Sequence, residues 1–167
     1  CALPICNSRG GNLIDIAQGM DQVTERLERV RGLGGMSGIP TPWPTMNRAT
    51  AGYQPADLIT YVGRMGIGKT MNLLYQAECA FLEGHSSLFV TTEMGSEQIT
   101  RRWMAMRYGL NSDMLKSGMV SNNLMRLMRG FKADLLGRER FRILSLGTNA
   151  KVSAVEAAVE EISPDVI

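Results

Sequence analysis

The sequence lacks the features of membrane-spanning, secreted and zinc-stabilised proteins. No apolar run approaches the ~20 residues that a membrane-spanning helix needs, and no signal-peptide pattern opens the chain. There are only three cysteines, Cys1, Cys6 and Cys79, without the further Cys/His pair that would complete a zinc site. Cys79 falls in a predicted helix, where a buried free thiol is the ordinary role. We therefore expect no membrane contact and a reducing compartment.

The composition is that of a globular domain. The 167 residues are 44% hydrophobic and 20% charged, which is ordinary for a soluble fold and sufficient for a core without disulfides. The first residue is Cys rather than Met, and residues 164–167 read as the beginning of a buried strand. We expect the chain to be a piece of a longer protein, cut at both ends.

Charge is distributed unevenly along the chain. The net charge is only +2, yet residues 99–142 carry ten basic and three acidic side chains. A basic stretch can attract nucleic acid. Arginines on a solvated helix face would give the same pattern and are the more common case. The sequence leaves both interpretations open.

Residues 12–31 predict one amphipathic helix. Their apolar side chains recur at three- and four-residue steps with charges between them, and Gly32, Gly34 and Gly35 end the pattern. The apolar stripe must dock either on its own domain or on a neighbouring subunit. The proline-rich residues 38–44 that follow predict an extended connection.

Strand and helix patterns alternate through the rest of the chain. The expected strands are residues 57–62, 87–92 and 141–145 and a fourth that begins at Val166, and the expected helices are residues 69–82, 96–108, 122–136 and one that opens at Ser153. Ser96 is the expected N-cap of its helix, and residues 153–156 form a capping-box pattern. The alternation predicts an α/β fold with a parallel sheet and helices on both faces.

One motif carries recognisable chemistry. Its eight residues have the spacing of a phosphate-binding P-loop and read Gly63, Arg64, Met65, Gly66, Ile67, Gly68, Lys69 and Thr70. Glycines let successive backbone N–H groups point at phosphate oxygens, and the following helix adds its N-terminal dipole. We expect Lys69 to reach the β- and γ-phosphates of a nucleoside triphosphate, and the Thr70 hydroxyl to bind Mg²⁺.

Glu93 directly follows the expected strand at residues 87–92. In α/β sheets chemistry collects at the carboxyl ends of the strands, which is where the P-loop also lies. A carboxylate there could orient or activate the water that attacks the γ-phosphate. Position alone fits an acid at the start of a helix equally well.

Several segments in a fixed order resemble one family. They read GIPTPW at 38–43, MN at 46–47, TAGYQPADLI at 50–59, the P-loop, and TEMGSEQ at 92–98. Together they look like the RecA-type motor domain of DnaB-type replicative helicases. The match in order and spacing runs from about Gly38 to Arg102, and it continues more loosely to the end of the chain.

This resemblance implies a fold, an activity and a set of roles. The fold would be a RecA-like P-loop NTPase core, with residues 36–167 as the N-terminal part of the motor domain. Residues 1–35 would be a remnant of the preceding domain and its linker helix. Lys69 and Glu93 would be the catalytic pair, and Arg102 would lie near the bound nucleotide. The cofactors would be ATP and Mg²⁺.

The resemblance also implies partners. The helix at residues 12–31 would pack on the adjacent subunit of a hexameric ring, which would unwind DNA during replication by moving along one strand. Primase and a helicase loader are further candidate partners. The compartment would be the cytoplasm of a bacterium or of a virus-infected host cell.

The chain departs from the family pattern at several positions. Met65 stands where a small residue or proline is usual, and Asn47 where aspartate is usual; both changes look tolerable. Pro42 and Ala56 replace frequent glycines. The Walker B aspartate, the glutamine sensor, the DNA-binding loops and the arginine finger of the family would all lie beyond Ile167.

Two other classes of protein remain as alternatives. Another RecA-type ring ATPase, such as a recombinase, would share the P-loop and the alternating pattern. A non-catalytic nucleotide-binding or assembly module, or a small-molecule kinase, would share the P-loop alone. The segments GIPT at 38–41 and TEMGSEQ at 92–98 favour the helicase, and no lid pattern typical of a kinase follows the P-loop helix.

Overall fold

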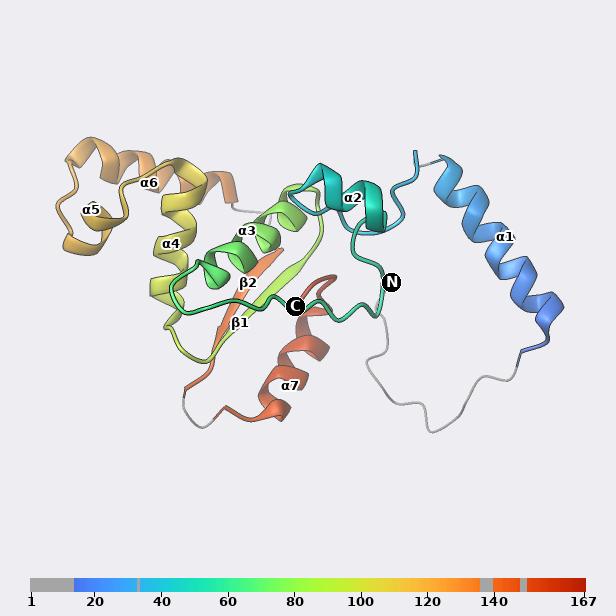
Figure 1. The fold of residues 1–167 in the computed structure, drawn as a ribbon. Coiled ribbons are helices and arrows are strands. Elements are labelled where there is room, and N and C mark those ends of the chain that lie inside the picture. The colour runs from blue at the N-terminus through green and yellow to red at the C-terminus, as the bar shows by residue number, and fades with distance from the viewer. Residues whose placement is uncertain (1–13, 33, 136–139, 148–149) are drawn as a thin grey trace. The chain divides into compact units, whose positions relative to one another are not determined.

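A computed structural model describes residues 14–32, 34–135, 140–147 and 150–167 (Figure 1). The chain forms two compact units that divide between Thr60 and Tyr61. The first unit contains α1 (Ile16–Gly32) and α2 (Pro44–Thr50). The second contains α3 (Lys69–Leu82), β1 (Ser87–Thr91), α4 (Ser96–Tyr108), α5 (Ser112–Ser117), α6 (Asn122–Leu135), β2 (Phe141–Ser145) and α7 (Val152–Ile162). No helix in the described ranges is long and apolar enough to cross a membrane.

Helix α1 confirms the amphipathic helix expected at residues 12–31, of which residues 12 and 13 lie outside the described ranges. None of its residues is buried. Met20, Val23 and Leu27 of the apolar stripe are 65%, 57% and 64% exposed. The first unit therefore leaves the stripe open to solvent.

The proline-rich segment is followed by a short helix that the sequence patterns did not indicate. Helix α2 begins at Pro44, where proline is well tolerated because its missing N–H has no partner within the first turn of a helix. Asn47 fixes the chain ahead of it, since its side chain accepts from the Thr41 N–H at 2.8 Å and donates to the Thr41 carbonyl at 2.9 Å. An isolated antiparallel bridge between Ile39 and Tyr53 closes the segment.

The sheet of the second unit is parallel. β1 and β2 pair from Ser87 with Phe141 to Thr91 with Ser145. Ser87 donates its N–H to the Arg140 carbonyl, whereas Leu88 donates to the Val166 carbonyl. Because adjacent N–H groups of a strand point in opposite directions, Val166 lies on the edge of β1 away from β2. β1 is therefore the central strand, and Val166 takes the position expected of a further parallel strand.

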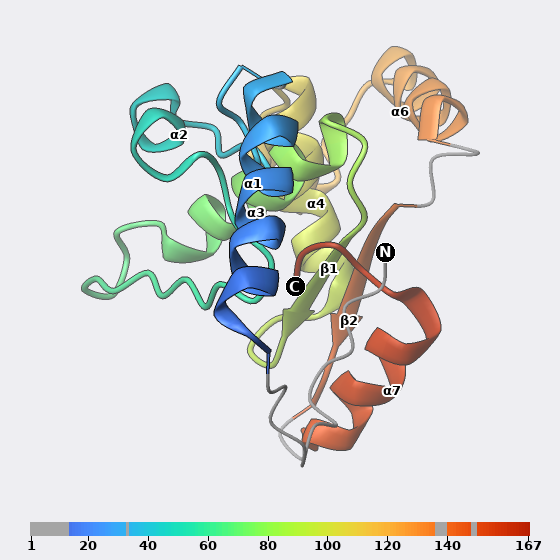
Figure 2. The same cartoon turned by 90° about the vertical axis from the view of Figure 1, so that its right-hand side faces the viewer.

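Helices cover both faces of this sheet. α3 and α4 pack on one face, and α7 lies on the other (Figures 1 and 2). The core forms between α3, α4 and β1, and its buried members are Leu74, Ala77, Phe89, Ile99 and Trp103. This arrangement confirms the expected α/β fold with a parallel sheet and helices on both faces.

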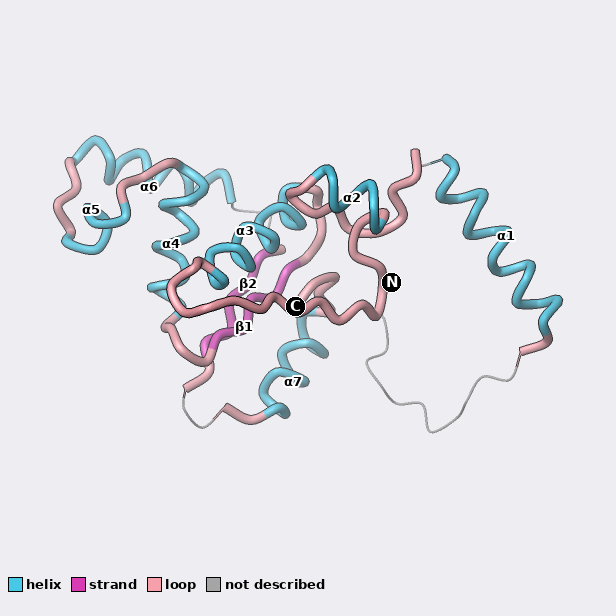
Figure 3. The backbone as a smooth tube through the Cα atoms, viewed as in Figure 1, coloured by secondary structure: helices cyan, strands magenta, loops and turns pink. Residues whose placement is uncertain are grey.

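Three expected local features are wrong. Residues 57–62 form no strand but part of the loop that connects α2 to α3 along the chain (Figure 3), with Leu58 92% and Val62 90% exposed. A strand is stabilised by its paired neighbour, and the described residues provide none for this segment. Gly95 rather than Ser96 is the N-cap of α4. Lys151 is the N-cap of α7, so Ser153 lies inside that helix and forms no capping box.

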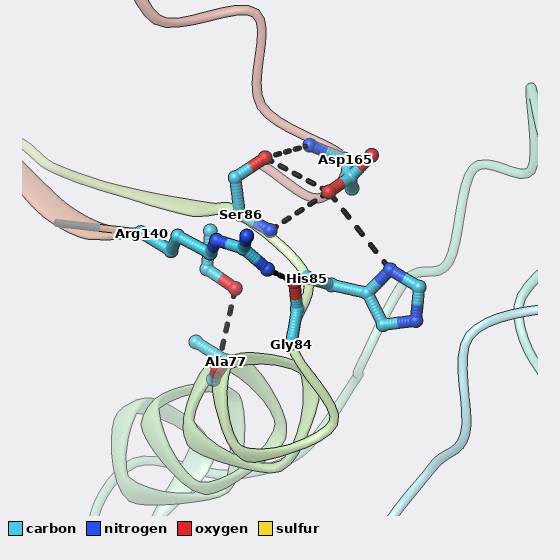
Figure 4. A network of polar contacts seen from close by, with 7 residues as sticks. Ala77, Gly84, His85, Ser86, Arg140 and Asp165 are labelled. Atoms are coloured by element: carbon cyan, nitrogen blue, oxygen red, sulfur yellow. Dashed lines mark hydrogen bonds and ion pairs between the residues drawn. The ribbon is translucent and has the colours of Figure 1, made fainter. Parts of the chain in front are cut away.

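A polar network joins the turn before β1 to the C-terminal segment (Figure 4). The Asp165 carboxylate accepts from the Ser86 N–H at 2.7 Å and from the Ser86 hydroxyl at 2.9 Å, and His85 Nδ1 lies 3.8 Å away. Burial opposes ionisation of Asp165, but the bonds from Ser86 and the nearby His85 outweigh it, and the pKa of Asp165 falls below its usual value. The network holds Val166 beside β1.

Candidate functional site

The structure places the P-loop residues on an open turn that leads into α3. Gly66 and Gly68 have φ values of 81° and 92°, in the left-handed region that glycine adopts without strain. A Cβ at either position would meet no atom within 4 Å, so the backbone is open at these two glycines, whereas the Ile67 side chain packs against Gly63. Lys69 and Thr70 are the first two residues of α3. This geometry fits an anion held by backbone N–H groups and a helix N-terminus.

The Lys69 ammonium lies over the loop itself. Its Nζ donates to the Gly63 carbonyl at 2.8 Å and to the Arg64 carbonyl at 2.9 Å. Carbonyl oxygens are weaker partners for an ammonium than phosphate oxygens, which carry formal charge. Met65 and Ile67 are 96% and 64% exposed, which leaves the loop accessible from solvent. A bound triphosphate could therefore draw Lys69 away from these carbonyls.

A hydrogen bond that the sequence patterns did not indicate ties the segment before the loop to α3. The Tyr61 hydroxyl donates to Gln76 Oε1 at 2.8 Å, and Gln76 is a buried residue of α3. At the other end of the loop, the Gly68 carbonyl accepts the first helical bond of α3, from the Asn72 N–H at 2.9 Å. The chain on both sides of the loop is therefore held to the same helix.

Glu93 lies exposed in the loop after β1, and its neighbours fix that loop. The Met94 N–H donates to the Thr91 hydroxyl at 3.2 Å, and the Ser145 hydroxyl donates to the Met94 carbonyl at 3.1 Å. The Leu146 N–H donates to the Thr91 carbonyl at 2.8 Å. Residues at the carboxyl ends of both strands therefore position the Glu93 segment.

The P-loop and the Glu93 loop lie at the same end of the second unit. α3 packs on β1 and is joined to it by the short connection at residues 83–86, so the two elements run in opposite directions. The N-terminal end of α3 therefore lies toward the carboxyl end of β1, as Figure 1 shows. Arg102 is half-buried on α4, the helix that follows the Glu93 loop. The roles of these residues remain predictions.

A cation at this site would depend on the nucleotide. Within the described ranges, no three His, Cys, Asp or Glu residues form a group that could hold a metal ion. Mg²⁺ in phosphate-transfer sites commonly takes one or two protein ligands, several waters and the phosphate oxygens themselves. The hydroxyl of Thr70, the second residue of α3, is of the chemical type that fits that role.

The sequence of this chain is similar to those of known proteins. Residues 38–161 match the family described as DnaB-like helicase C terminal domain. The chain is 34% identical over 99 residues to the replicative DNA helicase DnaC of Bacillus subtilis, a match that covers 58% of this chain and 22% of that protein. It is 30% identical over 134 residues to the replicative DNA helicase DnaB of Buchnera aphidicola, which covers 77% and 28%. The chain thus spans about a quarter of the length of these relatives.

A solved structure shares the fold. The ATPase domain of G40P superposes with a TM-score of 0.75, over 90% of this chain and 52% of that one, at 18% sequence identity. At this identity the likeness concerns the fold alone. The parallel strands and covering helices of the second unit have the arrangement of part of a RecA-like fold.

Proposed function

This chain belongs to the DnaB-like helicase C-terminal domain family, and on that premise we propose that it is part of an ATP-driven replicative DNA helicase. The observation that carries the proposal is the loop at residues 63–70, with its two left-handed glycines and with the Lys69 ammonium held at the Gly63 and Arg64 carbonyls. ATP would bind there with Mg²⁺ on Thr70. Hydrolysis of the γ-phosphate would supply the energy for unwinding.

We propose separate roles for the residues around the loop. Backbone N–H groups of the loop and α3 would hold the phosphates, and Lys69 would neutralise charge on the β- and γ-oxygens. Glu93 would orient the attacking water from the carboxyl end of β1. Arg102 would lie toward the nucleotide from α4. Thr91 and Ser145 would act through Glu93 by fixing the loop that carries it.

The assembly would be a hexameric ring on single-stranded DNA in the cytoplasm. The exposed apolar stripe of α1 supports a subunit contact, because Met20, Val23 and Leu27 have no cover within their own unit. We propose residues 1–35 as the linker helix with a domain remnant, and residues 36–167 as the first part of the motor domain. Primase and a helicase loader would be partners of the complete protein.

The test replaces Lys69 by alanine in the complete protein. The variant should lose roughly 100-fold or more in ATP hydrolysis and in unwinding of a forked duplex, because a preorganised charge for the phosphates is removed. Lys116→Ala, which removes an exposed lysine of α5, is the matched control and should keep both rates. A Lys69→Ala protein that unwinds at the normal rate would show that the loop does not drive the motor.

A further inference from the structure

Helix α6 is fixed to the second unit by one side only. Its Phe131 ring stacks on Tyr108 of α4, with the ring centroids 3.6 Å apart and the planes at 3°. Leu135 packs against the core, and Leu124 and Met128 on the same side are half-buried. In both views the helix lies at the margin of this unit (Figures 1 and 2). Its other side faces solvent.

The exposed side of α6 is basic. Arg126, Arg129 and Lys132 follow one another at three-residue steps and are all exposed. At 3.6 residues per turn they lie within about 120° of one another around the helix and span about 9 Å of its axis; Arg126 lies opposite the packed side and Lys132 borders it. Asp134 is the acidic residue of the α6 sequence, and the helical register places its backbone position about 140° from that of Arg129. We call the side of α6 that carries the three cations the α6 basic face.

These charges are not neutralised by the described residues. Arg126 donates to the neutral Asn123 Oδ1 at 2.5 Å, and none of the three cations is in an ion pair within the described part of the chain. Two arginines of α4 are in ion pairs, Arg101 with Glu97 at 3.2 Å and Arg107 with Glu78 at 2.9 Å. The α6 basic face therefore presents an unshared positive potential to solvent.

We propose that the α6 basic face binds the phosphodiester backbone of DNA, as a contact separate from the nucleotide loop. The partner follows from the charge: a row of cations that form no ion pair within the described residues complements a row of phosphates. A membrane surface does not fit, because an interfacial helix must insert its apolar side. That side of α6 is occupied by Tyr108 and the core. The contact rests on the proposed function in that the whole protein acts on DNA.

The test measures how DNA affinity depends on salt. In the complete protein, Arg126→Gln, Arg129→Gln and Lys132→Gln are combined, and binding to a single-stranded oligonucleotide is titrated without ATP across a range of salt. Each lost phosphate contact makes the negative slope of log K against log salt shallower by about 0.7. The slope of the triple variant should therefore be less negative than that of the wild type by about 2. Circular dichroism should be unchanged, since the substituted side chains are exposed and glutamine is a good helix former.

Two control variants separate this contact from general charge and from fold. A triple variant with Arg29→Gln, Arg48→Gln and Lys151→Gln has the same net charge and should keep the wild-type slope. A double variant with Arg126→Lys and Arg129→Lys keeps the positive charges of the α6 basic face, and its salt dependence should also equal that of the wild type. An unchanged slope in the α6 triple variant, or an equal loss in the charge-matched control, overturns the proposal.

Two further outcomes are informative. If the α6 triple variant loses affinity for polyglutamate but not for DNA, the face binds an acidic protein and the proposal is wrong. The titration needs no ATP, so its result does not depend on whether Lys69→Ala abolishes unwinding. The contact and the motor function can therefore fail separately.

Discussion

At the scale of one residue, nucleotide binding must change the hydrogen-bond partners of the Lys69 ammonium. Its ammonium is held by the carbonyl oxygens of Gly63 and Arg64, so a triphosphate has to replace two neutral acceptors with charged ones. Charge-assisted hydrogen bonds are about twice as strong as neutral ones, which favours the exchange. The free loop thus has its lysine close to the position where phosphates would bind.

Asp165 makes the fold sensitive to acid. Its pKa is lowered in the folded chain by the bonds from Ser86, so the stability it adds is present above its unfolded pKa of about 4 and is lost as pH falls through the lower folded value. Asp165→Asn should therefore reduce the unfolding midpoint in urea at pH 7, and the difference from wild type should shrink below about pH 4. Asp21→Asn, an exposed carboxylate of α1, is the control. A difference that stays constant with pH would contradict this role.

At the scale of elements, α3 and α4 are joined by a partly buried ion pair. Arg107 of α4 donates to Glu78 of α3 at 2.9 Å, and Glu78 is only 6% exposed. Burial opposes the charge of Arg107, but its bonds to Glu78 and Tyr108 outweigh this and raise its pKa. The guanidinium also lies over the rings of Phe81 and Trp103.

Removal of this arginine should be costly. Arg107→Ala leaves Glu78 buried without its cation, and we expect the free energy of unfolding to fall by about 3 kcal/mol. Arg101→Ala removes an arginine from an exposed pair with Glu97 and should cost under about 1 kcal/mol. Urea unfolding of both variants measures the difference. Equal losses would show that the Glu78 pair is no stronger than a surface pair.

The elements that the sequence predicts correctly are those whose pattern is local. β2 (Phe141–Ser145), α4 and α6 have the expected positions because their apolar periodicity and flanking residues lie within each segment. Residues 57–62 have the apolar character of a strand, but strand formation depends on a distant partner that the local pattern cannot reveal. Helices α2 and α5 were missed because each is under two turns long. Asn111, which caps α5 by accepting two N–H bonds, was the available signal.

The residues of the candidate site are likewise of two kinds, those that a local sequence pattern reveals and those that it does not. The P-loop was predictable because eight consecutive residues encode it, and Glu93 because it follows a strand directly. Tyr61 with Gln76, and Ser145 with Met94, join residues separated by 15 and 51 positions. Such pairs depend on tertiary packing, which no single segment of the sequence contains.

At the scale of the whole molecule, α1 should control assembly. Met20→Ser with Leu27→Ser makes the exposed apolar stripe polar, and the complete protein should then lose its hexamer at micromolar concentration in light scattering. Gln22→Ser with Arg29→Ser changes the opposite face of the helix and should leave the hexamer intact. If the variant with the polar stripe remains fully hexameric, α1 does not hold the subunits together and its stripe packs within its own subunit.

The central claim is that ATP hydrolysis at this site drives unwinding, and Glu93 tests it most directly. In the complete protein, Glu93→Gln should bind ATP with unchanged affinity yet unwind a forked duplex about 100-fold more slowly, since the water loses its base. Glu97→Gln, four residues along and paired with Arg101 at the surface, should unwind normally. Wild-type unwinding by Glu93→Gln would contradict the account.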